Sequence, residues 1–140
     1  MKVEDAVIPA RFMVTLGHLI GTMMVFKTKI NNVYAGLVVD PTSAQITAAE
    51  AGIDAALSVA LISFIFDFIG MIFGLSIFVM KVNVIQTALH FFGGVLVAHF
   101  IMYEWDYRWI WRIVLCFNLP TAIVEIGVIF TLFYLKTAVY

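Results

Sequence analysis

AALSVALISFIFDFIGMIFGLSIFVM, residues Ala55 to Met80, is the stretch that decides the fold. A helix needs roughly 20 mostly apolar residues to cross the ~30 Å hydrocarbon core of a bilayer, and this run exceeds that length. Asp67 is its one charged residue. Because lipid offers no hydrogen-bond partners to backbone groups, such a run is expected to be a membrane-spanning helix.

Three further runs have the same character, at residues 7–26, 84–103 and 110–135. Of the 140 residues, 64% are apolar and 12% are charged, with a mean hydropathy of +1.06. Soluble domains average about 45–50% apolar and about 25% charged residues. The sequence therefore predicts an all-α integral membrane four-helix bundle, as a single domain over residues 1–140. A net charge of −1 excludes a basic nucleic-acid-binding surface, and a single cysteine excludes an internal disulfide.

The connections between the four runs are short except for the first. Residues 81–83 leave almost no loop, which predicts a tight hairpin between the second and third helices. Residues 104–109 combine aromatic rings with charges, as headgroup depth favours. Residues 27–54 form the one sizeable segment expected outside the membrane. Within it, Thr47 and Glu50 have capping-box spacing, so the second helix is expected to begin near Thr47.

Four spans place both termini on one side of the membrane. Basic residues do not reveal which side, because four are expected on each: Lys2, Arg11, Lys81 and Lys136 on the terminal side, and Lys27, Lys29, Arg108 and Arg112 on the other. Arg11 lies just inside the first run, where a long side chain can extend to the headgroups.

Two acids, Asp67 and Glu125, lie well inside the second and fourth runs at similar depths. An ionised carboxylate at the centre of a membrane helix costs about 2.5–3.5 kcal/mol on insertion scales, so each acid needs a partner, a cavity or a proton. The two acids are expected to face each other. They are candidates for a proton relay or an ion site, but the favoured interpretation is a protonated acid hydrogen-bonded to Thr, Ser or His on another helix. Asn118 shares the face of Glu125 at helical spacing.

His18 and His90 lie in the first and third runs. Two histidines that face each other across a bundle can ligate a b-type haem, whereas a structural role predicts hydrogen bonds between helices. No paired spacing marks these histidines, so no cofactor and no metal site is predicted.

Small residues at four-residue spacing mark the expected helix contacts, because they let helix backbones approach closely. The pairs are Gly17 with Gly21 in the first run and Gly70 with Gly74 in the second. No nucleotide-binding loop or hydrolase triad is found, so an enzyme is not predicted.

The order and spacing of several short motifs resemble the transmembrane protein 107 family along nearly the whole chain. The motifs are Ile8-Pro9-Ala10-Arg11-Phe12, Leu16, His18, Leu19, Ala55 to Val59, Asp67 with Gly70, His90, Glu104-Trp105, Leu119-Pro120, Glu125, and Phe133, Leu135 and Lys136 near the end.

This resemblance implies a non-enzymatic component of the ciliary transition zone, with both termini in the cytoplasm. Members of the family act in the Meckel-syndrome (MKS) module with tectonic, B9-domain and other multipass proteins. They support cilium formation and the control of ciliary membrane protein composition and signalling. Two other classes remain open: a small proton- or ion-linked transporter subunit that uses Asp67 and Glu125, and a haem-bearing membrane anchor subunit.

Overall fold

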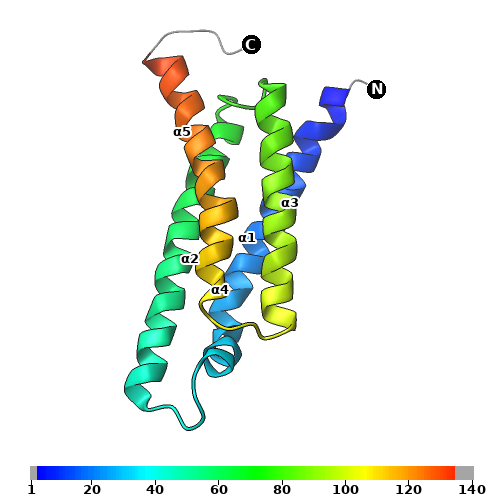
Figure 1. Ribbon diagram of the computed structural model, residues 1–140. Coiled ribbons are helices and arrows are strands. Elements are labelled where there is room, and N and C mark those ends of the chain that lie inside the picture. Colours follow the sequence, from blue (N-terminus) through cyan, green and yellow to red (C-terminus); the bar gives the residue numbers. More distant parts are fainter. Residues whose placement is uncertain (1–2, 135–140) are drawn as a thin grey trace.

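The computed structural model describes residues 3–134, and these residues form an antiparallel bundle of four long helices (Figure 1). The helices are α1 (Val3–Gly36), α2 (Ser43–Ile72), α3 (Met80–Met102) and a composite fourth helix made of α4 (Trp109–Ile113), the π-helical turn η1 (Val114–Asn118) and α5 (Leu119–Phe133). Four helices are long and apolar enough to cross a membrane, which confirms the predicted fold class. The predicted helix end at residue 135 lies outside the described residues.

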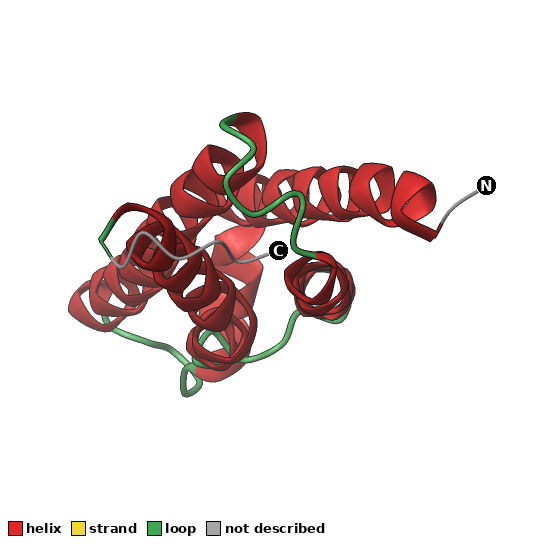
Figure 2. Ribbon diagram, turned by 90° about the horizontal axis from the view of Figure 1, so that it is seen from above, coloured by secondary structure: helices red, strands yellow, loops and turns green. Residues whose placement is uncertain are grey.

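The beginning of α1 and the end of α5 lie at the same end of the bundle, here called the terminal end (Figure 1). The opposite end carries the α1–α2 and α3–α4 connections and is called the loop end. Viewed along the bundle, α1 is strongly tilted relative to α3 (Figure 2). The most extensive helix interface joins α1 to α3, whereas the backbones of α1 and α5 do not approach each other within contact distance.

The buried face of α1 is more polar than its outer face. Steps of four and three residues bring one stripe inward, and this stripe consists of Arg11, Thr15, His18, Thr22, Val25 and Asn32, all at most 1% exposed. Large apolar side chains such as Met13, Ile20 and Met24 are more than half exposed. A helix in water shows the reverse arrangement. The pattern is the one expected where lipid, and not water, surrounds the bundle.

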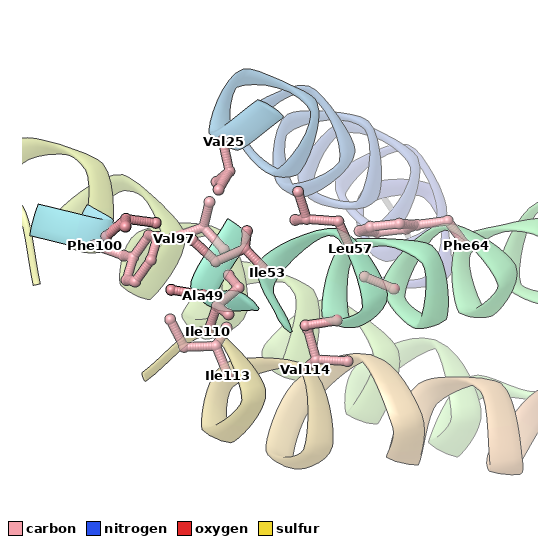
Figure 3. Packing of buried hydrophobic residues seen from close by; sticks show 13 residues of the cluster. Val25, Ala49, Ile53, Leu57, Phe64, Val97, Phe100, Ile110, Ile113 and Val114 are labelled. Atoms are coloured by element: carbon pink, nitrogen blue, oxygen red, sulfur yellow. The ribbon is translucent and has the colours of Figure 1, made fainter. Parts of the chain in front are cut away.

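Apolar packing is concentrated from the middle of the bundle to the loop end (Figure 3). Val25 of α1 lies there with Ile53 and Leu57 of α2, Phe100 of α3 and Ile110 of α4, all at most 1% exposed. The polar residues that are buried in the bundle gather mainly toward the terminal end. The interior is thus divided along its length into an apolar part and a polar part.

The loop end differs from the sequence prediction because helices occupy most of residues 27–54. α1 continues to Gly36, and α2 begins at Ser43 with Thr42 as its N-cap, paired with Gln45 in a capping box. The predicted cap at Thr47 is wrong, since Thr47 lies inside α2. At ~1.5 Å per residue, α1 is about 50 Å long and exceeds the ~30 Å hydrocarbon core. The Lys29 ammonium lies 2.7 Å from both oxygens of Asp54, which joins the two helices near this end.

The connection between α2 and α3 is longer than predicted. α2 ends at Ile72 and α3 begins at Met80, so the tight hairpin at residues 81–83 is not formed. Gly74 has a φ of +69°, and the N–H of Leu75 bonds to the carbonyl of Gly70 at 2.9 Å. This is a Schellman motif, in which a left-handed glycine ends a helix.

The fourth helix changes its winding just before Pro120. The N–H of Leu119 bonds to the carbonyl of Val114, five residues back, and this bond defines the π turn. Proline has no N–H and crowds the carbonyl four residues before it, and a widened turn relieves both problems. The turn also lets Asn118 and Glu125 face the interior together with Ile110.

Candidate functional site

Arg11 and Glu125 form an ion pair that is sealed inside the bundle. Arg11 is 1% exposed and Glu125 is 0% exposed, and the guanidinium Nη2 donates directly to Glu125 Oε1. The backbones of α1 and α5 do not touch, so this pair spans the gap between them. The expectation that Arg11 extends to the headgroups is wrong. It lies on the inward stripe of α1, and a carboxylate is within its reach.

Side chains near the terminal end complete the environment of this pair. Arg11 Nη1 donates to Ser76 Oγ at 3.0 Å and to Asn83 Oδ1 at 2.7 Å. Ser76 Oγ in turn donates to Glu125 Oε1 at 2.8 Å. Ser76 lies in the α2–α3 connection and Asn83 in the first turn of α3. A buried charge pair is tolerated when further hydrogen bonds satisfy its remaining groups. Ser76 and Asn83 do this in part, whereas Arg11 Nε and Glu125 Oε2 have no hydrogen-bond partner among the described residues.

Gly70 makes room for the carboxylate of Glu125. A Cβ atom built on Gly70 would collide with Glu125 Oε2. α2 and α5 therefore approach each other at a point where one helix has no side chain. Two predicted site residues, Gly70 and Glu125, are therefore in contact. Because Gly70 has no side chain, the Glu125 carboxylate can occupy the space next to α2.

Asp67 has its own partners one turn farther toward the loop end. Thr121 Oγ1 lies 3.0 Å from Asp67 Oδ2 and 2.7 Å from the carbonyl oxygen of Asn118. The single hydroxyl proton can be donated to only one of these oxygens at a time. His90 Nε2 lies 3.2 Å from the same carboxylate oxygen but does not form a hydrogen bond with it.

The two acids do not contact each other directly. Gln86 of α3 contacts Glu125 and the backbone of Thr121, and the Thr121 hydroxyl lies beside Asp67. Gln86 Nε2 lies 3.0 Å from the carbonyl of Thr121 and 3.3 Å from Glu125 Oε1. Glu125 is paired with Arg11, whereas Asp67 has the Thr121 hydroxyl beside it and the His90 ring near it without a hydrogen bond. The predicted direct contact between the two acids is not formed, and Thr121 and Gln86 lie between them.

His18 and His90 end this network on the loop side. Their Nδ1 atoms lie 3.3 Å apart, so one ring donates and the other accepts. Phe64 stacks on His90 at 5.6 Å between centroids and meets His18 edge-on at 5.0 Å. A Cβ atom on Gly93 would lie 2.5 Å from the His18 ring. The two imidazoles are in direct contact within tight packing, so no slot for a porphyrin separates them.

These buried polar residues are called the polar network hereafter: Arg11, His18, Asp67, Ser76, Asn83, Gln86, His90, Asn118, Thr121 and Glu125. All are at most 1% exposed. Asn118 takes part through its backbone carbonyl, which accepts from Thr121 Oγ1. From Arg11 to His18 the network extends seven residues along α1, which is about 10 Å. Beyond His18 lies the apolar packing of Val25 and Leu57. The network therefore reaches through about a third of a ~30 Å hydrocarbon core.

Sequence reasoning missed Ser76, Asn83 and Gln86 as partners of the acids. A signal was present in α3, where Asn83, Gln86 and His90 follow one another at steps of three and four. That spacing puts all three on one helix face. Ser76 lies in a connection outside any helix, and no sequence pattern indicates its contact with Glu125.

The comparison with known families matches residues 7–129 to the family model TMEM107, described as a transmembrane protein. The chain belongs to the transmembrane protein 107 family. A human relative named Transmembrane protein 107 is 30% identical over 94% of both chains, and the Xenopus laevis protein of that name is 28% identical over 95% of both. The Danio rerio protein is 25% identical over 90% of this chain and 93% of its own. No solved structure is a significant match.

The other glycines that were predicted to lie at helix contacts in this transmembrane protein 107 family member have different surroundings. Gly21 lies against Val97, with its Cβ position 3.4 Å from Val97 Cγ1. Gly17 has no neighbour within 4 Å of that position, and Gly74 ends α2, so neither lies at a helix–helix contact as predicted. The pattern of two small residues four apart does not distinguish a packed glycine from one that faces lipid or ends a helix.

Within the described part of this family member, no cluster of three His, Cys, Asp or Glu side chains could hold a metal ion. Cys116 is exposed on the lipid-facing side of the π turn. The arrangement of the polar network is suited to holding helices in one register, since hydrogen bonds and an ion pair link α1, α2, α3 and α5 inside the bundle.

Proposed function

We propose that this protein is a non-enzymatic membrane component of the ciliary transition zone, where it acts in the MKS module. Its role is to support cilium formation and the control of ciliary membrane protein composition and signalling. The observation that carries this proposal is membership of the transmembrane protein 107 family over residues 7–129, together with what the family resemblance implies.

The polar network supports a scaffold role. Its ion pair and hydrogen bonds lie inside the bundle and join side chains of different helices, which favours one arrangement of the four helices. The outer surface is left to large apolar side chains, including Phe73, Phe92 and Phe133, each more than half exposed. Such a surface suits lateral contact with lipid and with other membrane helices. The proposed partners are tectonic, B9-domain and multipass MKS-module proteins, with both termini of this chain in the cytoplasm.

The test is to tag the protein in a ciliated cell and to image it against a basal-body marker. The expected result is a ring at the cilium base, with fewer cilia and altered receptor content when the protein is removed. Uniform distribution over other membranes, with normal cilia after removal, would contradict the proposal. A glycosylation-site scan of residues 37–42 and of the chain ends tests the proposed topology in the same cells.

A second candidate is a proton- or ion-linked transporter subunit. It is favoured by the presence of Asp67 and Glu125 in one buried network that also holds two histidines. Against it, Glu125 is already paired with Arg11, and the network gives way to apolar packing at Val25 and Leu57. A relay that moves protons across a membrane must connect both sides. Liposomes that contain the purified protein and a pH-sensitive dye are therefore expected to show no flux above protein-free liposomes.

A haem-bearing anchor is tested by the absorption spectrum of the purified protein. The contact between His18 and His90 predicts no Soret band after incubation with haemin. A Soret band that is present in the wild type and disappears in a His90→Phe variant would show that the protein binds haem.

A further inference from the structure

A hollow of about 260 Å³ at the loop end is lined by Trp105, Asp106 and Trp109. We call it the tryptophan hollow. It lies between the last residue of α3, Met102, and the start of α4, so it occupies the headgroup level of the membrane rather than the hydrocarbon core. Nothing in the polar network or the proposed scaffold role uses it.

The walls of the hollow have an arrangement that attracts cations. The rings of Trp105 and Trp109 lie 5.7 Å apart between centroids and are inclined at 57° to each other. Asp106 is one-third exposed. Its Oδ1 accepts from the backbone N–H of Arg108 at 2.9 Å and lies 3.4 Å from the Arg108 Nε, so a cation in the hollow would share this carboxylate with the Arg108 guanidinium. A cation within about 6 Å of an indole face is attracted by the ring quadrupole, and a neighbouring carboxylate adds to that attraction.

The backbone that carries these rings is held in place before any ligand arrives. Asn32 of α1 is 1% exposed, and its Nδ2 donates to the carbonyl of Trp105 at 2.8 Å. The N–H of Tyr107 donates to the carbonyl of Asn32 at 3.1 Å. Glu104 has a φ of +48°, a conformation that few non-glycine residues adopt and that the surrounding structure must hold. The hollow is therefore a preformed site, and binding there needs little reordering of the loop.

A positive charge flanks the same wall. Arg112 lies one turn along α4 from Trp109, and its Cζ lies over that ring at 4.1 Å from the centroid, so its guanidinium covers one face and leaves the other for a ligand. The hollow thus combines aromatic faces and a carboxylate with an adjacent guanidinium, which binds phosphate well. A zwitterionic headgroup has the complementary pattern: a cation joined by a short link to a phosphate.

We propose that the tryptophan hollow binds the phosphocholine headgroup of a membrane phospholipid. The trimethylammonium group lies against Trp105, Trp109 and Asp106, and the phosphate faces Arg112. Choline is favoured over ethanolamine because a quaternary ammonium has no N–H groups to satisfy. Aromatic faces can therefore replace its weak hydration, whereas a primary ammonium would lose strong hydrogen bonds to water.

The test is a competition between two lipids for binding to the purified protein. The protein in maltoside micelles is mixed with equal amounts of phosphatidylcholine and phosphatidylethanolamine that carry identical acyl chains, and native mass spectrometry counts each bound species. We expect a two- to fivefold preference for phosphatidylcholine, the range of an interfacial cation–π contact. Trp109→Leu and Asp106→Asn are expected to abolish the preference.

Tyr103→Leu is the matched control, because Tyr103 is an exposed aromatic residue of the same loop that does not line the hollow. It should keep the preference. Asp106→Asn preserves the shape of the side chain, so it remains informative if Trp109→Leu disturbs folding. Equal binding of the two lipids by the wild type, or an unchanged preference in Asp106→Asn, would overturn the proposal. So would binding of a trimethyl-lysine peptide by a protein that shows no lipid preference.

Discussion

Replacing Glu125 by glutamine is expected to destabilise the bundle by about 3 kcal/mol, because it leaves the Arg11 guanidinium buried without a counter-charge. Breaking a buried ion pair from one side typically costs about 3–5 kcal/mol, and an unpaired charge at the centre of a membrane helix costs about 2.5–3.5 kcal/mol. The lower end applies here, since Arg11 keeps its hydrogen bonds to Ser76 and Asn83. About 3 kcal/mol corresponds to roughly a hundredfold change in the folding equilibrium constant.

The double-mutant cycle separates the ion pair from other effects. Arg11→Met alone should cost a similar amount, because it leaves the Glu125 carboxylate unpaired. The double variant Arg11→Met with Glu125→Gln contains neither charge, so it should cost clearly less than the sum of the two single changes. The matched control is the ion pair between Lys29 and Asp54. Because Asp54 is 45% exposed, the coupling energy of this pair should be below about 1 kcal/mol.

The assay is unfolding in mixed micelles with a rising fraction of denaturing detergent, followed by circular dichroism. Coupling at the buried pair should exceed coupling at the control pair by about 2 kcal/mol. Strict additivity for Arg11 and Glu125 would refute the reasoning, since it would mean that the two charges do not depend on each other in the folded bundle.

Three further changes are expected to separate residues that look alike in the sequence. Gly70→Ala should cost about 1–3 kcal/mol in the same assay, because the new Cβ meets the Glu125 carboxylate, whereas Gly17→Ala should be neutral or stabilising by up to about 1 kcal/mol. An equal effect at both positions would count against this contact. Gly74→Ala should cost about 1–2 kcal/mol through its φ of +69°, and a neutral result would remove the Schellman assignment. Asp67→Asn should cost less than about 1 kcal/mol, because an amide oxygen can still accept from the Thr121 hydroxyl, and complete loss of function in a correctly localised variant would favour an ion site.

The four spans were predictable because hydropathy is a local property that adds up along a run of residues. The inward face of α2 was predictable in part for a similar reason. Ala56, Ser63, Asp67 and Gly70 recur at helical spacing, and the structure buries all four. A polar or small residue in a membrane helix has little reason to face lipid, so its position on the helix wheel indicates the interior.

The partners of these residues were not predictable. Arg11 and Glu125 are 114 residues apart in the chain, and nothing local to either one identifies the other. Near a helix end, an arginine can turn outward to the headgroups or inward to a carboxylate, and both choices have the same sequence signature. The predicted end of the second helix, at Met80, was wrong because apolar residues continue through the α2–α3 connection. Hydropathy alone does not reveal a turn within an apolar stretch.

By itself, the sequence determined that this chain lies in a bilayer as four helices with a few costly polar groups among them, because the transfer of side chains and backbone from water to lipid depends on each segment alone. Only the tertiary structure decided how those groups are satisfied: Arg11 with Glu125, Asp67 with Thr121, and His18 with His90. Pairing energies depend on the distances between helices, and those distances arise only when all four helices pack together.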